Sequence, residues 1–491
     1  MKRLLNLVLV LSTFNSFAQK PESFAKTITA ADLKKHLYVV AAPEMEGRET
    51  ATAGQKKAAD YIENYFKQLA LQPGNKDSYQ MHFDVNQDSL VSAALEVNGQ
   101  AFQLDKDFNP SIANIPATLR FSEIVLVGSN AIDSLRNANL AGKLLMIVGI
   151  VPSATRAQGG GLAMLLQGKG VAGILSVSSV FPRKSPLSRK GNQTLSGFRR
   201  TLPPQQYSIS ENVARAIIGS EFDNLKTNTS IVKTYSANIL LDVKKVTLTT
   251  QSSNVVAVLP GTDLKDQYLF ITAHYDHLGK RDSVIYYGAD DDGSGTVSVL
   301  ELAEAFSKAK AEGKGPRRSI VFMTVSGEEK GLWGSEHYSN YPLFPLDKTT
   351  ADLNIDMIGR SDTARKGDTT NYVYVVGDDK LSSELKTISE AMNKKYIRLE
   401  LDYKFNDPKD KNFIYYRSDH YNFAKKGVPI IFYYDGMLVG DYHRPTDTPD
   451  KINYPLMAKR AQLVFYTAWE IANRNEMLKR DIPLDANVFN R

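Results

Sequence analysis

Apolar and polar positions follow two different periods along the chain, and the change of period indicates where helices and strands form. In residues 30–42 and 52–71 apolar side chains recur every three or four positions, which predicts two amphipathic helices. Residues 83–107 alternate around the turn dipeptide Asn98-Gly99, which predicts strands joined by a hairpin. The N-terminal helices are expected to cover a sheet.

After residue 254 strand-like and helix-like segments alternate. The expected strands include YLFITAHYD, SIVFMTVSGEE, ADLNIDMIG, YVYVVGD and VPIIFYYDG, and the expected helices lie near residues 294–309, 334, 381–395 and 455–473. This order predicts an α/β fold with a mixed, largely parallel central sheet and helices on both faces. Ligands of such sheets gather at the carboxyl ends of the strands.

Residues 112–243 have a different character, with short apolar runs, small-residue stretches and no histidine. This segment contains no candidate metal ligand, and we interpret it as an inserted smaller α/β module with its own core. Residues 19–111 and 244–491 then form one discontinuous main domain. The chain length of 491 residues fits this division, because one core rarely organises so many residues.

The composition excludes several classes of protein. Apolar residues make up 42% and charged residues 23% of the chain, which is typical of a folded globular protein. The net charge of +6 is spread over the whole length, without the interleaving of aromatic and basic residues that single-strand binding requires, so no nucleic-acid partner is expected. Because cysteine is absent, neither disulfides nor a lipid-modified cysteine is expected.

The N-terminus has the pattern of a secretory signal peptide. Lys2 and Arg3 precede an apolar run from Leu4 to Leu11, and a polar stretch ends in small residues at Ala18. The alternative is a membrane anchor, but the run is far shorter than the roughly 20 residues that span a bilayer. Residues 1–18 are therefore predicted to be removed, which predicts an exported protein, periplasmic or secreted, without stable membrane insertion after cleavage.

Candidate ligands follow the apolar runs of the C-terminal half. His274 ends one run, and Asp276 lies two residues further on, where it points to the same side and can orient the imidazole. Three consecutive aspartates, Asp290 to Asp292, stand before a helix. If they lie at a buried edge, three carboxylates repel one another unless a cation compensates them.

Further carboxylates occur at two more strand ends. Glu328 and Glu329 are adjacent, so their side chains diverge; one can bind metal while the other transfers a proton. Asp356 ends a buried run, where an unpaired carboxylate is costly. His443 lies in a polar loop before the last helix. Imidazoles and carboxylates in this number are the components of a two-metal hydrolytic centre.

In chain order these residues resemble the di-zinc aminopeptidases of metallopeptidase family 28. The family pattern is H-x-D, then G-A-D-D-x-x-S-G, a Glu-Glu pair, a strand-end Asp and a late His before D-T, and all five elements occur here in that order. The segment PEMEGRETATAGQKKAADYI resembles the N-terminal helices of the family. Residues 112–243 resemble the protease-associated domain that is inserted in some members.

The resemblance implies two Zn²⁺ ions per chain and peptide substrates with a free N-terminus. His274, Asp291 and Asp356 would hold one ion, and Asp291, Glu329 and His443 would hold the other, so that Asp291 bridges them. Glu328 would be the general base and acid, and Asp276 would orient His274. A cis peptide bond would join Asp291 and Asp292.

Several alternatives stay open at this point. His277 and His337 are expected to be structural, and the segment from Arg417 to His420 resembles a loop that forms a wall of the family's substrate pocket. The same centre also supports carboxypeptidase or dipeptidase activity. A glutaminyl cyclase would use one zinc on a similar fold, and a non-catalytic scaffold would have lost ligands. The preferred substrate residue and the oligomeric state do not follow from the sequence.

Overall fold

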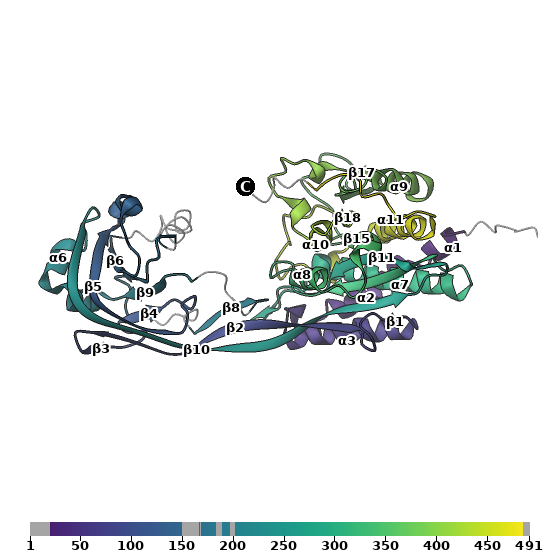
Figure 1. Ribbon diagram of the computed structural model, residues 1–491. Coiled ribbons are helices and arrows are strands. Elements are labelled where there is room, and N and C mark those ends of the chain that lie inside the picture. Colours follow the sequence, from purple (N-terminus) through teal and green to yellow (C-terminus); the bar gives the residue numbers. More distant parts are fainter. Residues whose placement is uncertain (1–19, 150–165, 167, 183–188, 197–201, 485–491) are drawn as a thin grey trace, which may run out of the picture. The chain divides into compact units, whose positions relative to one another are not determined.

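The computed structural model describes residues 20–149, 166, 168–182, 189–196 and 202–484 (Figure 1). The predicted signal peptide lies outside these residues. In the described part of the chain, no helix is both long enough and apolar enough to cross a bilayer. The chain divides into two compact units, residues 1–83 with 251–491 and residues 84–250.

The first unit is built on a mixed sheet with the strand order β17-β16-β18-β15-β11-β14-β10. Strand β11 runs parallel to β14 and β15, β15 runs parallel to β18, and β16 runs parallel to β17, whereas β16–β18 and β10–β14 are antiparallel. The predicted mixed, largely parallel sheet is thereby confirmed. These strands are β10 (Val232–Leu259), β11 (Leu264–His274), β14 (Arg318–Val325), β15 (Thr349–Ile355), β16 (Tyr372–Val376), β17 (Glu400–Asp402) and β18 (Ile430–Tyr434). The short strand β1 (Gln72–Pro73) pairs with β10, and β12 (Lys280–Arg281) pairs with β13 (Val284–Ile285).

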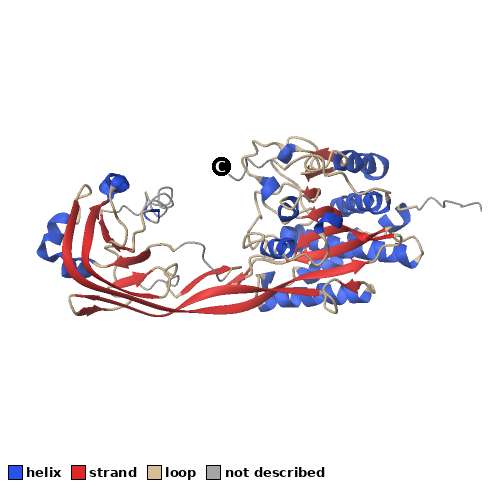
Figure 2. Cartoon of the chain, in the orientation of Figure 1, coloured by secondary structure: helices blue, strands red, loops and turns tan. Residues whose placement is uncertain are grey.

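Helices cover both faces of this sheet (Figure 2). Alternate residues of a strand point to opposite faces, and in β11 Leu269 and Ile271 join one apolar core while Phe270 joins the other. The first core also contains residues of α2, α3, α7 and α11, and the second contains residues of α8 and α10. Since both faces are buried, the central strands are apolar throughout instead of alternating.

Six helices lie close to where the periodicity predicts them. They are α2 (Ala30–Val40), α3 (Ala53–Gln68), α7 (Gly295–Ala311), α8 (Trp333–Asn340), α9 (Leu385–Met392) and α11 (Tyr454–Asn473). The short helices α1 (Glu22–Ala25) and α10 (His420–Ala424) were not predicted. The side chains of Thr29 and Thr52 accept hydrogen bonds from the first turns of α2 and α3, which fixes where these helices begin.

The second unit has its own apolar core, and β10 contributes strand residues to both units. Its strand order is β10-β5-β6-β7-β9-β4, and Asn98 and Gly99 form the predicted hairpin turn between β2 and β3, both with positive φ. Its elements are β2 (Gln80–Val97), β3 (Gln100–Phe102), β4 (Phe108–Pro110), β5 (Ala117–Gly128), β6 (Leu144–Val148), β7 (Gly173–Val177), β8 (Lys190–Thr194), β9 (Gln205–Ile209), α5 (Glu211–Ile218) and α6 (Phe222–Leu225), together with residues 232–250 of β10.

The limits of the second unit differ from the predicted 112–243, since the unit begins at residue 84 and ends at residue 250. The physical reason is packing. Leu95, Val97 and Phe108 belong to the same apolar core as Ile124 and Leu144, so the strands before residue 112 are part of this unit. The relationship of this unit to protease-associated domains stays a prediction.

Candidate metal centre

Three strands of the first unit end at one edge of the sheet, and each is followed by predicted ligands. His274 is the last residue of β11, Glu328 and Glu329 follow β14, and Asp356 follows β15. Because β11 runs parallel to both neighbours, the three carboxyl ends coincide. Residues that are far apart in the sequence are thereby brought to one place.

Asp291 comes from the turn Ala289–Ser294, which precedes α7. The peptide bond between Asp291 and Asp292 is cis, as the resemblance implied. The three aspartates were expected to need a compensating cation, and the structure shows which other partners they have. Asp290 accepts a hydrogen bond from the Gly359 amide at 2.8 Å, and Asp292 accepts bonds from the amides of Gly295 and Met357. Backbone N–H groups thus satisfy both oxygens of Asp292, whereas Asp290 Oδ2 is buried without a hydrogen-bond partner among the described residues.

The first group of ligand atoms surrounds His274. Its Nε2 lies 3.3 Å from Asp291 Oδ1 and 3.5 Å from Asp356 Oδ1. All three side chains are buried, and their ligand atoms are close enough together to hold one metal ion. This is the set that the resemblance implied for one zinc.

The second group surrounds Glu329. His443 Nε2 lies 3.1 Å from Glu329 Oε2 and 3.1 Å from Asp291 Oδ2. Asp291 therefore contributes one carboxylate oxygen to each group, which is the geometry of a bridging ligand. All five predicted ligands converge at this site.

His277 also belongs to the second group, although its expected role was structural. Its Nδ1 lies 2.8 Å from Glu329 Oε1 and 3.9 Å from Asp291 Oδ2. The ring is fully buried and lies 5.9 Å from the ring of His443. Its position three residues after His274 was the only signal in the sequence, and it did not distinguish a ligand from a core histidine.

The donor set fits zinc. His274 Nε2, Asp291 Oδ2 and Glu329 Oε1 are buried and have no hydrogen-bond partner among the described residues. Burial alone would raise the pKa of Asp291, but the imidazoles of His274 and His443, which face it at 3.3 and 3.1 Å, hold that pKa well below its usual range, so the group is an anionic carboxylate. Unpaired buried carboxylate oxygens and imidazole nitrogens are costly without a cation, and they are ligands that zinc accepts.

Glu328 stands apart from both ligand groups. Its Oε2 lies 4.0 Å from His274 Nε2, and its side chain lines a pocket at the site. Burial raises the pKa of Glu328 well above its usual range; His274 opposes the rise, whereas Glu329 and Asp356 add to it. A carboxylate with a raised pKa that holds no metal can take up a proton and return it.

Asp276 supports both His274 and Glu328. The nearest partner of His274 Nδ1 is the carbonyl oxygen of Asp276 at 3.1 Å, while the carboxylate lies at 3.7 Å. That carboxylate accepts hydrogen bonds from Thr50 Oγ1 at 2.8 Å and from the Glu328 amide at 3.2 Å. Nδ1 must donate to the carbonyl, which leaves Nε2 free for a metal.

Arg48 and Asp447 position the loops around the ligands. Both lie in segments that carry the family resemblance, PEMEGRETATAG and the late D-T, but those segments did not indicate their roles. Arg48 is fully buried and donates to four backbone carbonyl groups, among them those of Tyr275 and Gly288. Burial lowers the pKa of Arg48 to about 10. Asp447 accepts hydrogen bonds from the amides of Asp290 and Asp291 at 3.0 to 3.2 Å. Both therefore hold the turn that carries the shared aspartate.

The pocket beside Glu328 combines acidic, apolar and donor groups. Tyr442 stacks on His443 with ring centroids 3.9 Å apart, and Arg417 donates a hydrogen bond to the Tyr442 hydroxyl at 3.0 Å. The expected wall formed by the segment from residue 417 to 420 is thus represented by Arg417. The lining residues are Asp291, Glu328, Asp356, Met357, Ile414, Arg417, Phe432, Tyr434, Leu438 and Tyr442.

Comparisons with known proteins point to the same region of the chain. Residues 254–468, which contain every predicted ligand, match the model of the family described as peptidase family M28. A probable leucine aminopeptidase from Arthroderma otae is 30% identical over 228 residues, which cover 45% of this chain and 58% of that protein. A probable zinc metalloprotease from Pyrenophora teres f. teres is 24% identical over 334 residues, covering 60% of this chain and 67% of that protein.

Solved structures share the fold at low sequence identity. An aminopeptidase from Aneurinibacillus sp. strain AM-1 superposes with a TM-score of 0.55 at 19% identity, over 95% of this chain and 99% of that one. A zinc aminopeptidase from Bacillus subtilis superposes with a TM-score of 0.52 at 19% identity, over 93% and 99% of the respective chains. These likenesses establish the α/β fold. The chain spans only 58% of the Arthroderma relative's length, so that relative's activity does not transfer directly.

Proposed function

Because residues 254–468 belong to peptidase family M28, we propose that the protein is a di-zinc exopeptidase that removes the N-terminal residue of peptides. His274, Asp291 and Asp356 hold one zinc, and Asp291, Glu329 and His443 hold the other. The observation that carries the proposal is the position of Glu328, which contacts the site at 4.0 Å from His274 without belonging to either ligand group.

Zinc bound at these ligands would supply a Lewis acid that activates water and polarises the peptide carbonyl. Glu328 removes a proton from the attacking water and delivers it to the leaving amine. The Asp276 carboxylate accepts a hydrogen bond from the Glu328 amide, and the Asp276 carbonyl oxygen accepts one from the His274 ring. Asp276 therefore fixes the position of the general base relative to the zinc ligand. In this proposal Tyr442, whose hydroxyl accepts from Arg417 and which lines the same pocket as Glu328, donates a hydrogen bond to the developing oxyanion.

The lining of the pocket supports cleavage at the N-terminus. Asp291, Glu328 and Asp356 are acidic groups that suit a positively charged α-amino group, while Arg417 is the one basic residue in the lining. Met357 and Leu438 offer apolar surface to the side chain of the first residue. An unblocked peptide with an apolar first residue is therefore the substrate that this pocket fits.

Export completes the proposal. It rests on the charged, apolar and small-residue pattern of residues 1–18. N-terminal sequencing of the protein recovered from the periplasm or the medium should begin at Gln19. Recovery of the uncleaved chain from the cytoplasm would refute this part of the proposal alone.

The central test compares leucine amide, N-acetylated leucine amide and N-terminal glutaminyl peptides, using the wild type and Glu328→Gln. The wild type should bind two equivalents of zinc and cleave only the unblocked amide. The variant should keep its zinc and lose at least about 100-fold in kcat, since general base catalysis contributes 10²- to 10⁴-fold. One zinc equivalent with cyclisation of N-terminal glutamine would indicate a cyclase, and absent zinc binding would indicate a scaffold. A fully active variant would refute the role of Glu328.

A further inference from the structure

A second pocket of the first unit lies next to the pocket that Glu328 lines. Its walls contain Phe405, Phe413, Tyr415, Tyr416 and Tyr421, and we call it the aromatic pocket. Ile414 lines both pockets. The ring of Phe405 also lies 5.7 Å from the ring of Tyr434, which lines the pocket at the metal centre. One layer of side chains therefore separates the two pockets.

The three tyrosines form a preorganised wall. Tyr415 and Tyr416 meet edge to face at 5.0 Å, Tyr416 and Tyr421 at 5.0 Å, and Tyr415 and Tyr421 at 5.8 Å. His420 Nε2 donates a hydrogen bond to the Tyr415 carbonyl at 2.8 Å and fixes the backbone behind the wall. A wall that is already ordered binds a ligand without a further loss of side-chain entropy.

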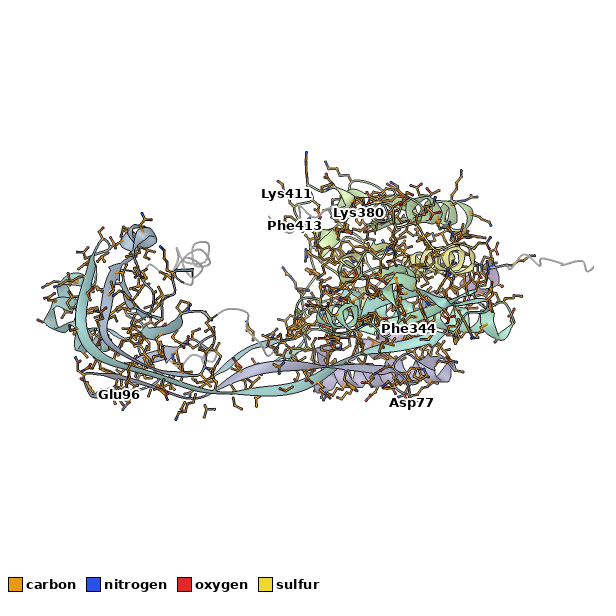
Figure 3. All side chains as sticks on the ribbon, viewed as in Figure 1. Asp77, Glu96, Phe344, Lys380, Lys411 and Phe413 are labelled. Carbon is orange, nitrogen blue, oxygen red and sulfur yellow. The ribbon has the colours of Figure 1, made fainter. Side chains whose placement is uncertain are left out.

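Two features of this pocket are unfavourable in the free protein. Phe413 is 55% exposed and has a φ of 54°, a left-handed conformation that is rare for a bulky residue and is concentrated at functional sites. The Tyr415 hydroxyl is buried and has no hydrogen-bond partner among the described residues. Figure 3 shows Phe413 beside Lys380, which also lines the pocket and whose Nζ lies 5.2 Å from the Tyr415 ring.

We propose that the aromatic pocket binds an apolar or aromatic side chain of the peptide substrate on the far side of the scissile bond, at the second or third residue. This inference rests on the proposed function. An extended peptide advances about 3.3 Å per residue and turns successive side chains to opposite sides. A substrate whose first side chain fills the pocket beside Glu328 can therefore place a later one beyond Ile414. The enzyme would select peptides with an aromatic residue near the N-terminus over short amides.

The test measures kcat/KM for leucine amide, Leu-Gly-Gly, Leu-Phe-Gly and Leu-Gly-Phe with the zinc-loaded full-length protein. One of the two phenylalanine peptides should be cleaved about 10-fold more efficiently than Leu-Gly-Gly, because a phenyl ring is removed from water. Phe413→Ala and Tyr416→Ala should each reduce this preference to less than about threefold and should leave cleavage of leucine amide unchanged. Tyr341→Ala, which removes another exposed aromatic ring of the same unit, is the matched control and should keep the preference.

The outcomes separate the two proposals. If the wild type does not cleave leucine amide, the proposed function fails and this inference falls with it. If leucine amide is cleaved but the phenylalanine and glycine peptides are cleaved equally well, only the aromatic subsite is refuted. A preference that persists in both pocket variants also refutes it, because the preference then arises elsewhere.

Discussion

His277 Nδ1 lies 2.8 Å from Glu329 Oε1, while His443 Nε2 lies 3.1 Å from Glu329 Oε2, so two imidazoles contact the two oxygens of one carboxylate. The histidines differ in their second partner. His443 is 3.1 Å from Asp291 Oδ2, whereas His277 is 3.9 Å from the same atom. His443 therefore reaches both carboxylates of the group, and His277 contacts one.

This difference predicts unequal effects of replacing the two histidines. His443→Gln should bind one zinc equivalent in place of two, because a ligand is lost. His277→Gln should keep two equivalents and weaken the second by about 10- to 100-fold, as expected for a residue that positions a ligand. Competition with a chelator of known affinity, followed by metal analysis, measures both. Loss of a zinc equivalent in the His277 variant but not in the His443 variant would reverse the assignment.

That these side chains lie together could be predicted, because each is tied to a feature visible in the sequence. His274, Glu329 and Asp356 follow apolar runs, and runs that form neighbouring parallel strands place their ends together. Asp291 was identified by its place in an ordered set of motifs. The helices were predictable for a similar reason, since a single apolar stripe repeats with the period of the α-helix.

The supporting residues could not be predicted, because their roles depend on backbone positions that only the fold defines. Arg48 donates to carbonyl groups of residues as distant as Gly288, and no local pattern encodes such partners. The sequence alone favours a cation beside Asp290 and Asp292, because it does not show that the amides of Met357 and Gly359 donate to them from another loop. The start of the second unit was missed because only packing shows that Phe108 shares its core.

Arg48 predicts a stability effect. Its guanidinium donates to the carbonyl groups of Val40, Tyr275, Tyr287 and Gly288 at 2.7 to 2.8 Å. A lysine keeps the charge but cannot direct donors to all four, and each buried acceptor left without a donor costs about 1 to 3 kcal/mol. Arg48→Lys should therefore destabilise the protein by about 3 kcal/mol.

Thermal denaturation measures this loss, and Arg281→Lys, an exposed replacement of the same kind, is its control. The Arg48 variant should also lose activity at temperatures where it is still folded, because the turn that carries Asp291 is loosened. Equal melting temperatures of the two variants would show that the buried guanidinium contributes no stability.

Asp378 predicts a dependence of stability on pH that is separate from the metal centre. Burial raises the pKa of this carboxyl to about 7, although a hydrogen bond from Asn406 opposes the rise. In the unfolded chain the group titrates near pH 4. Between these values the unfolded state releases the proton and the folded state retains it, so stability falls as the pH rises, by a contribution on the order of 4 kcal/mol.

Asp378→Asn should remove this contribution. The variant and the wild type should melt at similar temperatures at pH 4.5, and the variant should be the more stable one at pH 8. Asp379→Asn, an exposed neighbour, controls for the change of net charge. A difference between the Asp378 variant and the wild type that stays constant with pH would show that Asp378 is ionised in the folded protein throughout the range.

Tyr442 separates the packing of a ligand from the stabilisation of charge. Its ring stacks on His443 at 3.9 Å, and its hydroxyl accepts a hydrogen bond from Arg417 in the pocket that Glu328 lines. Tyr442→Phe keeps the stacking and removes the hydroxyl, so zinc binding should be unchanged while kcat falls by about 10²-fold, the usual effect of losing one oxyanion donor.

Tyr442→Ala removes both the ring and the hydroxyl and should weaken zinc binding as well, because His443 loses the ring that orients it. Zinc content and kcat measured on both variants test these roles separately. If Tyr442→Phe retained full kcat, the hydroxyl would have no part in the reaction.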